Sequence, residues 1–228
     1  AFNVAEELQT PVVLLSDQEI AQRKESIDAI DTTAFRVASR RAPTAAELEH
    51  YVRFRPTDSG VSPLSHPGLA GGAYQGAGIE HVDGGAPTAS GAVHARMNEK
   101  RFRKLDCLAA RRELFALHGD PAAPLVLIGW GSSAGVCREA LDLAREEGLE
   151  AKLLVPRLLY PVAEGLYREL FASVRAGLVV EQSHQGQLYR VLRMFIDVPR
   201  GIEPFARSGS NPFTPREIAE RIQDLAVA

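Results

Sequence analysis

The stretch Gly129-Trp130-Gly131-Ser132-Ser133 offers the clearest chemical possibilities in the sequence. It lies between an apolar run at residues 125–128 and a helical pattern that begins at Ala134. At such a junction, free backbone N–H groups and the positive end of the helix dipole can hold an anion such as a phosphate. The candidate cofactor-binding residues are therefore Gly129, Gly131, Ser132 and Ser133.

The spacing within this stretch favours a structural turn over a cofactor site. Its glycines follow the pattern GxGxxxG and end at Gly135, whereas dinucleotide sites use GxGxxG. Those sites also place an acidic residue at the end of the second strand, where this sequence has Leu154-Val155-Pro156-Arg157. An anion site is thus physically possible, but a turn is the stronger interpretation.

The same stretch matches the GxSxG elbow of serine hydrolases, with Ser133 as the nucleophile. His184 as the base and Glu164 or Glu181 as its orienting carboxylate follow in the required chain order. Hydrolase sheets, however, place several strands before the nucleophile, whereas the preceding residues here are mostly loop. The alternative is that Ser132 or Ser133 caps the following helix through its hydroxyl.

Metal-ligand residue types occur without metal-site spacing. Glu80-His81 and Asp83 stand close together in a loop, but neighbouring residues seldom reach one ion, and loop polar groups more often bond backbone N–H groups. His66 and His94 are isolated histidines, which are more often hydrogen-bonded surface groups than ligands. The two cysteines, Cys107 and Cys137, support neither a disulfide framework nor a CxxC site. We therefore expect no metal site and no catalytic residue of the chain's own.

Composition limits the remaining classes of function. With 228 residues, 45% of them hydrophobic, the chain is long enough for one full domain and part of another. A net charge of -3 gives no basic field for nucleic acid. No apolar run approaches the ~20 residues needed to span a bilayer, and the few cysteines suit a reducing cytoplasm. The first residues already read as the interior of a folded unit, so we expect a fragment of a longer protein.

The elements that position these residues fall into three stretches. Residues 1–30 have the pattern of a helix, a buried strand at residues 12–15, and a helix capped by Ser16-Asp17. Such a strand is usually covered on both faces and needs neighbours. Residues 31–95 are crowded with Gly and Pro and predict an ordered loop lying on a partner surface, with residues 56–92 mobile when that partner is absent.

A helix is predicted from residue 93 to 117, and its charge run is interpreted as a solvated face. That run consists of Glu99, Lys100, Arg101, Arg103 and Lys104. Beyond it, strands at residues 125–128, 151–155 and 178–180 alternate with helices at 134–148 and 162–174, after Gly186, and from Pro215 to Leu225. This alternation predicts an α/β fold with a parallel sheet in three layers.

Several separated stretches resemble the C-terminal portion of α subunits of 2-oxoacid:ferredoxin oxidoreductases, most closely the 2-oxoglutarate type. They are residues 1–8, 11–18, 58–63, 67–68, 78–81, 98–101, 104–105, 128–132, 139–140, 181, 186–188, 212–214 and 217–218. The resemblance implies that residues 1–30 end a thiamine diphosphate pyrimidine-binding domain, that residues 31–117 form a linker and helix, and that residues 118–228 form a transketolase C-terminal-like domain.

The resemblance also implies a cytoplasmic complex with a β subunit and ferredoxin. Its cofactors would be thiamine diphosphate, Mg²⁺, a [4Fe-4S] cluster and coenzyme A, and its products succinyl-CoA and carbon dioxide. The diphosphate end of the cofactor and the cluster belong to the β subunit in that family, and the activating carboxylate lies upstream. We therefore expect this chain alone to bind none of these cofactors and to act as scaffold and loop donor. The alternatives are a serine hydrolase acting through Ser133 and a non-enzymatic interaction module.

Two positions depart from the family pattern. The family commonly has an arginine directly after the Ser-Pro that matches Ser62-Pro63, and this chain has Leu64. The family also tends to follow its Glu-His with an Asp-Glu-like pair, and this chain has Val82-Asp83. If that arginine holds an anionic group, this chain has lost or moved one contact, which bears on the substrate.

Overall fold

The computed structural model describes residues 1–227 and separates into two compact units. Unit 1 comprises residues 1–14 and 25–107, and unit 2 comprises residues 15–24 and the chain from Leu108 onward. Within residues 1–227, no helix is both long and apolar enough to cross a membrane.

Unit 2 contains a five-stranded sheet in the order β1-β3-β2-β4-β5. The strands are β1 (Phe115–Gly119), β2 (Leu125–Gly129), β3 (Ala151–Pro156), β4 (Ala176–Glu181) and β5 (Ile202–Ala206). Strands β3, β2, β4 and β5 run parallel, whereas β1 pairs antiparallel with β3, with Phe115 opposite Pro156. The predicted α/β class is confirmed, with one antiparallel edge strand added to the parallel sheet.

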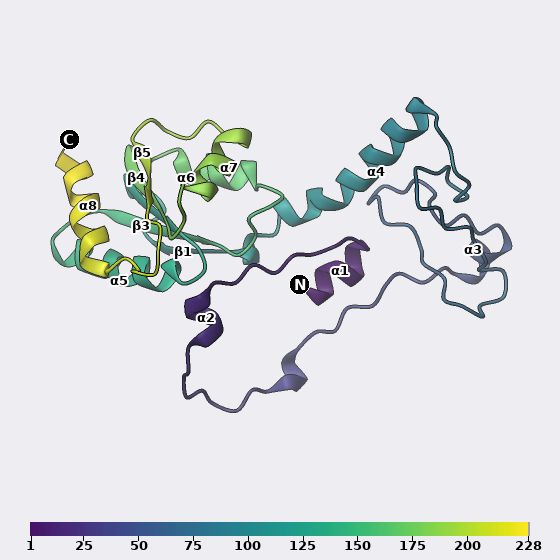
Figure 1. The fold of residues 1–228 in the computed structure, drawn as a ribbon, viewed down its shortest axis with the longest axis horizontal. Helices are drawn as coiled ribbons and strands as arrows, with labels where there is room; N and C mark the ends of the chain where they lie inside the picture. Colours follow the sequence, from purple (N-terminus) through teal and green to yellow (C-terminus); the bar gives the residue numbers. More distant parts are fainter. Residues whose placement is uncertain (228) are drawn as a thin grey trace. The chain divides into compact units, whose positions relative to one another are not determined.

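Helices cover both faces of this sheet (Figure 1). One face packs against α5 (Ser133–Glu146) and α8 (Pro215–Val227), and the other against α6 (Glu164–Phe171) and α7 (Gln187–Phe195). Successive residues of a strand point to opposite faces. Leu125 and Leu127 accordingly enter the first core, and Val126 and Ile128 the second. Burial on both faces explains why β2 reads as an uninterrupted apolar run.

Strands β1 and β5 were not predicted from the sequence. The predicted helix over residues 93–117 is wrong at its end, because α4 (Gly91–Ala109) stops before the short 3-10 helix η2 (Arg112–Leu114) and β1. Strand β5 contains Pro204, which argues against a central strand but is tolerated at an edge, where the missing N–H costs no ladder bond.

Unit 1 is loop-rich, as predicted. Its regular elements are α1 (Phe2–Leu8), the 3-10 helix η1 (Thr32–Ala34), α3 (Ala45–Glu49) and α4 up to Cys107. One isolated bridge pairs His81 with Pro87. The short helix α2 (Gln18–Gln22) belongs to unit 2.

The predicted buried strand at residues 12–15 is wrong in this structure. These residues form no strand, and Val13 and Leu14 are 79% and 80% exposed. A strand satisfies its N–H and C=O groups only by pairing with a neighbour. None of the five strands of unit 2 takes up this segment, so its apolar side chains remain in solvent.

The basic run of α4 is not the solvated face that was predicted. Lys100 is only 7% exposed, and its Nζ donates to the Gly60 carbonyl oxygen at 2.9 Å. Arg103 donates to the Thr57 carbonyl and Lys104 to the Gln9 carbonyl. Gly60 has φ +76°, and a Cβ there would lie 3.1 Å from Lys104 Cγ. A glycine is therefore required where this turn meets the helix.

Lys152 joins three segments of unit 2 from within the sheet. Its side chain is fully buried in β3, and burial lowers the pKa of its ammonium group. Its Nζ donates to the carbonyl oxygens of Pro121 and Leu170 at 2.6 and 2.8 Å, and to Ser173 Oγ at 2.9 Å. One side chain thus satisfies acceptors in the loop before β2, at the end of α6 and in the loop that follows it.

We expect Lys152→Met to lower the free energy of unfolding by about 2 kcal/mol, because it leaves buried acceptors without a donor. Urea denaturation followed by circular dichroism measures this change. The control is Arg138→Met on the exposed side of α5, which should leave the midpoint nearly unchanged. Equal stability of the two variants would contradict the assigned role of Lys152.

Candidate functional site

The chain changes direction at the carboxyl ends of β2 and β4, which are adjacent parallel strands. Helix α5 follows β2 onto one face of the sheet, and α7 leads away from β4 onto the other face. Such a divergence is the usual ligand position in doubly wound α/β folds. The loops after both strands meet there, since Trp130 Nε1 donates to Glu181 Oε2 at 3.4 Å. The two loops therefore share one edge of the sheet.

The anion position at the start of α5 is taken by a carboxylate of the chain itself. Ser132 N donates to Asp17 Oδ2 at 2.7 Å, while Asp17 Oδ1 accepts from Ile20 N at 3.0 Å and so caps α2. Gly131 has φ +58°, and a Cβ there would lie 2.7 Å from Asp17 Oδ2. Glycine therefore lets the carboxylate approach the backbone.

The electrostatics of Asp17 agree with this geometry. Burial raises the pKa of the Asp17 carboxyl, but the N–H groups of Ile20 and Ser132 outweigh it, so the pKa falls below its usual value of 3.8. The carboxylate is therefore ionised at neutral pH. It completes the binding geometry that the glycine-rich stretch predicted, from a position 115 residues away in sequence.

A second carboxylate fills the corresponding position at α7. Glu181 is 1% exposed, and its two oxygens accept from Leu188 N at 2.9 and 3.1 Å. The hydroxyl of Ser183 accepts from the N–H groups of Gly186 and Gln187. Negative charge at a helix N-terminus is favourable. A phosphate placed at this edge would face the like charges of Asp17 and Glu181, which disfavours it.

The residues of the hydrolase hypothesis are bound to other partners. His184 Nδ1 is hydrogen-bonded to Ser208 Oγ at 2.9 Å, and Glu164 lies 3.7 Å from Arg168. Glu181 is bound to α7, as described above. The predicted hydroxyl cap is also not formed by Ser132, which is the N-cap of α5 but binds Asp17 through its backbone. These contacts do not assemble a base with Ser133.

The Glu80-His81 loop is bound to α4 through ion pairs. Glu80 accepts two hydrogen bonds from Arg101, at 2.6 and 3.0 Å, and one from His94 at 2.6 Å. The Arg101 guanidinium holds the pKa of Glu80 well below its usual range. Asp83 pairs with Arg96 at 2.7 Å. Within residues 1–227, no three His, Cys, Asp or Glu side chains are grouped to hold a metal ion.

The other candidate ligands have structural surroundings. The ring of His81 lies against Phe54 at a centroid distance of 3.9 Å, and His66 Nδ1 is 3.0 Å from the Pro67 carbonyl oxygen. Cys137 is buried beneath β2, and burial raises the pKa of its thiol to about 12. Cys107 is exposed, with its thiol against the Lys104 carbonyl.

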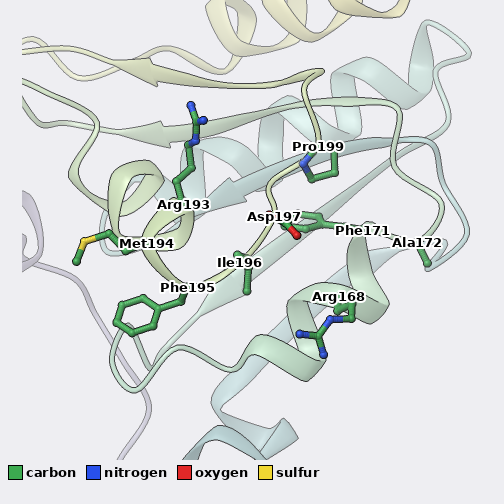
Figure 2. Close-up of a pocket in the computed structure, with 9 residues that line it drawn as sticks. All are labelled: Arg168, Phe171, Ala172, Arg193, Met194, Phe195, Ile196, Asp197 and Pro199. Carbon is green, nitrogen blue, oxygen red and sulfur yellow. The ribbon is translucent and has the colours of Figure 1, made fainter.

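A pocket of about 530 Å³ lies where α6 and α7 end (Figure 2). Its lining includes apolar Phe171, Ile196 and Pro199, and none of the residues singled out by the sequence. Arg168 and Arg193 stand in the last turns of the two helices, where positive charge is favourable. In Figure 2 their guanidinium groups do not converge on one point. The pocket therefore shares no residue with the loops at the edge between β2 and β4.

Comparison with known proteins identifies relatives of the whole chain. The sequence profile of pyruvate:ferredoxin oxidoreductase core domain II matches residues 123–218. The chain is 34% identical over 85% of its length to a 2-oxoacid:ferredoxin oxidoreductase 2, subunit alpha, from Aeropyrum pernix. It is 28% identical over 99% of its length to 2-oxoglutarate synthase subunit KorA from Methanothermobacter marburgensis.

A solved structure superimposes on 98% of the chain with a TM-score of 0.91 and 31% identity. It is the 2-oxoglutarate:ferredoxin oxidoreductase from Magnetococcus marinus with 2-oxoglutarate, coenzyme A and succinyl-CoA bound. These matches confirm the predicted resemblance and the α/β class described as transketolase C-terminal-like. The chain spans 30% of the Aeropyrum relative, 59% of the Methanothermobacter relative and 38% of the solved chain.

We expect Asp17→Ala to speed hydrogen exchange at the Ile20 and Ser132 amides and to lower stability by about 1 kcal/mol, because both N–H groups lose their acceptor. The folded pKa of Asp17 is depressed, so its contribution is full above the unfolded value of 3.8 and is lost as pH falls through the lower folded value. The difference in the free energy of unfolding between Asp17→Ala and the unchanged protein should therefore become smaller in acid. The control is Asp142→Ala, on the exposed side of α5. Unchanged hydrogen exchange in Asp17→Ala would contradict the role of Asp17 as the acceptor of these two amides.

Ser133 should not react with a fluorophosphonate probe, because no base is placed to activate it. Intact-mass spectrometry of the treated protein measures labelling, with Ser133→Ala as the control. Labelling that disappears in Ser133→Ala would restore the hydrolase hypothesis.

Proposed function

This chain is a homologue of part of the α subunit of 2-oxoacid:ferredoxin oxidoreductases, and we propose that it works as that part of a thiamine diphosphate-dependent, 2-oxoglutarate-type enzyme. The complete cytoplasmic complex converts 2-oxoglutarate and coenzyme A to succinyl-CoA and carbon dioxide and passes the electrons to ferredoxin. A β subunit and the remainder of the α subunit complete it.

The overlay with the Magnetococcus marinus enzyme carries this proposal. It covers 98% of the chain at a TM-score of 0.91, and that protein holds 2-oxoglutarate, coenzyme A and succinyl-CoA. The relative named 2-oxoglutarate synthase aligns with 99% of the chain. Together they favour 2-oxoglutarate among the 2-oxoacids. Leu64 stands where the family commonly has an arginine. Because an arginine can hold an anionic group of the substrate, the preference for one 2-oxoacid can differ at this position.

The chain's own residues do not fit the metal-containing or diphosphate parts of the cofactor set. A [4Fe-4S] cluster needs about four thiolates, and this chain has two cysteines. Within residues 1–227 no three His, Cys, Asp or Glu side chains are grouped to hold a metal ion. The helix N-termini that could receive a diphosphate already bind Asp17 and Glu181. We therefore place these cofactors on the β subunit and on the rest of the α subunit.

The role left to this chain is that of scaffold and loop donor. The sheet edge between β2 and β4 holds its two loops by internal hydrogen bonds, so it can present Gly129–Trp130 and the Gln182–Gln187 turn in a fixed geometry. We propose that these loops face the neighbouring subunit or the entrance to the active site. Pre-organised loops lower the entropy cost of assembly.

Isothermal titration calorimetry of the purified chain should detect no binding of thiamine diphosphate with magnesium, since the receptor groups are lacking. Reduction of a viologen dye that depends on 2-oxoglutarate should appear only when the β subunit and the upstream part of the α subunit are both added. Leaving out each component in turn provides the control. Dye reduction or cofactor binding by the chain alone would overturn the proposal.

A further inference from the structure

Three cationic side chains of unit 1 form a basic cluster: Arg53, Lys100 and Lys104. They surround Gln9 and the turn at residues 60–63. Arg53 Nη2 donates to Gln9 Oε1 at 2.8 Å, and Lys104 Nζ donates to the Gln9 carbonyl at 3.2 Å. Lys100 Nζ donates to Gly60 O at 2.9 Å, and a Cβ on Gly60 would lie 3.1 Å from Lys104 Cγ. The two lysines thus meet at the same turn.

The acceptors of the basic cluster are all neutral. They are backbone carbonyls and the Gln9 amide oxygen, and among the described residues no carboxylate forms an ion pair with any of the three cations. The nearby carboxylates Glu80 and Asp83 are paired with Arg101 and Arg96, and Asp83 also attracts the Lys100 ammonium group without forming an ion pair with it. A buried charge normally has a counter-ion. This cluster therefore carries positive charge that the described residues offset only in part.

The positive charge of the cluster affects the pKa of Lys100. Burial, and then the positive charges of Lys104, Arg53 and Arg101, lower the pKa of its ammonium group to about 8, although the Asp83 carboxylate opposes this shift. The pKa of Lys104 is lowered by the same causes, burial first and then Arg53. A negative group placed beside them would offset both effects.

The Arg53 guanidinium is held in one orientation by its neighbours. Its guanidinium lies 4.9 Å from the Phe54 ring centroid and 5.8 Å from that of Tyr74, so two aromatic faces fix its plane. Its Nε is buried and has no hydrogen-bond partner among the described atoms. The buried Nε is closed to a ligand from outside, whereas Nη1 and Nη2, which donate to the Pro63 carbonyl and to Gln9, each have a second N–H. Arg recognises carboxylates and phosphates by using two donors together.

We propose that the basic cluster binds an oxyanion, a carboxylate or a phosphate, supplied from outside the described chain. Arg53 and Lys104 are partly exposed and contact it directly, whereas buried Lys100 contributes through its charge. The inference rests on the contacts of unit 1 and does not depend on the proposed function.

The test is thermal denaturation of the complete chain at constant ionic strength, set with sodium chloride. Sodium phosphate and sodium succinate are titrated in separate arms, which distinguishes a phosphate site from a carboxylate site. A rise in the midpoint with either anion, beyond the chloride reference, is expected, because a ligand that binds only the folded state stabilises it. No rise with either anion would overturn the inference.

Variants locate the response. Arg53→Gln should weaken the apparent affinity for the effective anion about tenfold, the loss expected for one charge-assisted contact. Lys104→Gln should do the same and serves if Arg53→Gln does not fold. The matched control is Arg103→Gln, which removes another carbonyl-bound cation of α4 outside the cluster and should leave the affinity unchanged. An equal response in all three variants would place the anion elsewhere and overturn the inference.

Discussion

The sheet edge of unit 2 depends on one constraint, which is that the N–H groups at the start of a helix need acceptors. Helices α5 and α7 both begin where parallel strands end, and the first N–H groups of a helix have no carbonyl of a preceding turn to accept from them. The chain provides two carboxylates, Asp17 for the loop before α5 and Glu181 for α7. The position where many α/β proteins hold an anionic ligand is thereby used for internal structure, and residues 15–24 become part of the unit.

In unit 1 the groups that need partners are carbonyl oxygens of the loops, and cationic side chains provide the donors. Its loops expose carbonyl oxygens rather than N–H groups, and the basic residues of α4 donate to them, as Lys100 does to Gly60 and Lys104 to Gln9. Carboxylates of the loop, such as Glu80, then pair with arginines of the same helix. The loops of unit 1, which have little apolar surface, are thus held by α4, a helix whose charged sequence predicts exposure to solvent.

The sequence predicts elements that are encoded in neighbouring residues, but it does not predict contacts between residues that are far apart in the chain. The apolar run of β2 and the amphipathic pattern of α5 were predictable because each is encoded within a few turns or pleats. Strand β5 was missed because Pro204 is acceptable only at an edge, and edge position is a property of the assembled sheet. The contact of Asp17 with Ser132 joins distant segments, and only the Ser-Asp cap of α2 was visible in the sequence. The charge run of α4 was misread because composition does not reveal which face meets a loop.

The two units differ in how completely they satisfy their own groups, and that difference bears on what surrounds the chain. In unit 2 the loops after β2 and β4, the N-termini of α5 and α7, and buried Lys152 all have partners within the unit. In unit 1 the cations of the basic cluster donate to neutral acceptors and are offset only in part by Asp83, and Val13 and Leu14 expose apolar surface that a strand would normally bury. Exposed apolar residues and uncompensated charge both cost free energy that contact with another surface removes. Unit 1 therefore keeps groups that are satisfied only in part, whereas the loops at the edge between β2 and β4 of unit 2 are held by hydrogen bonds within that unit.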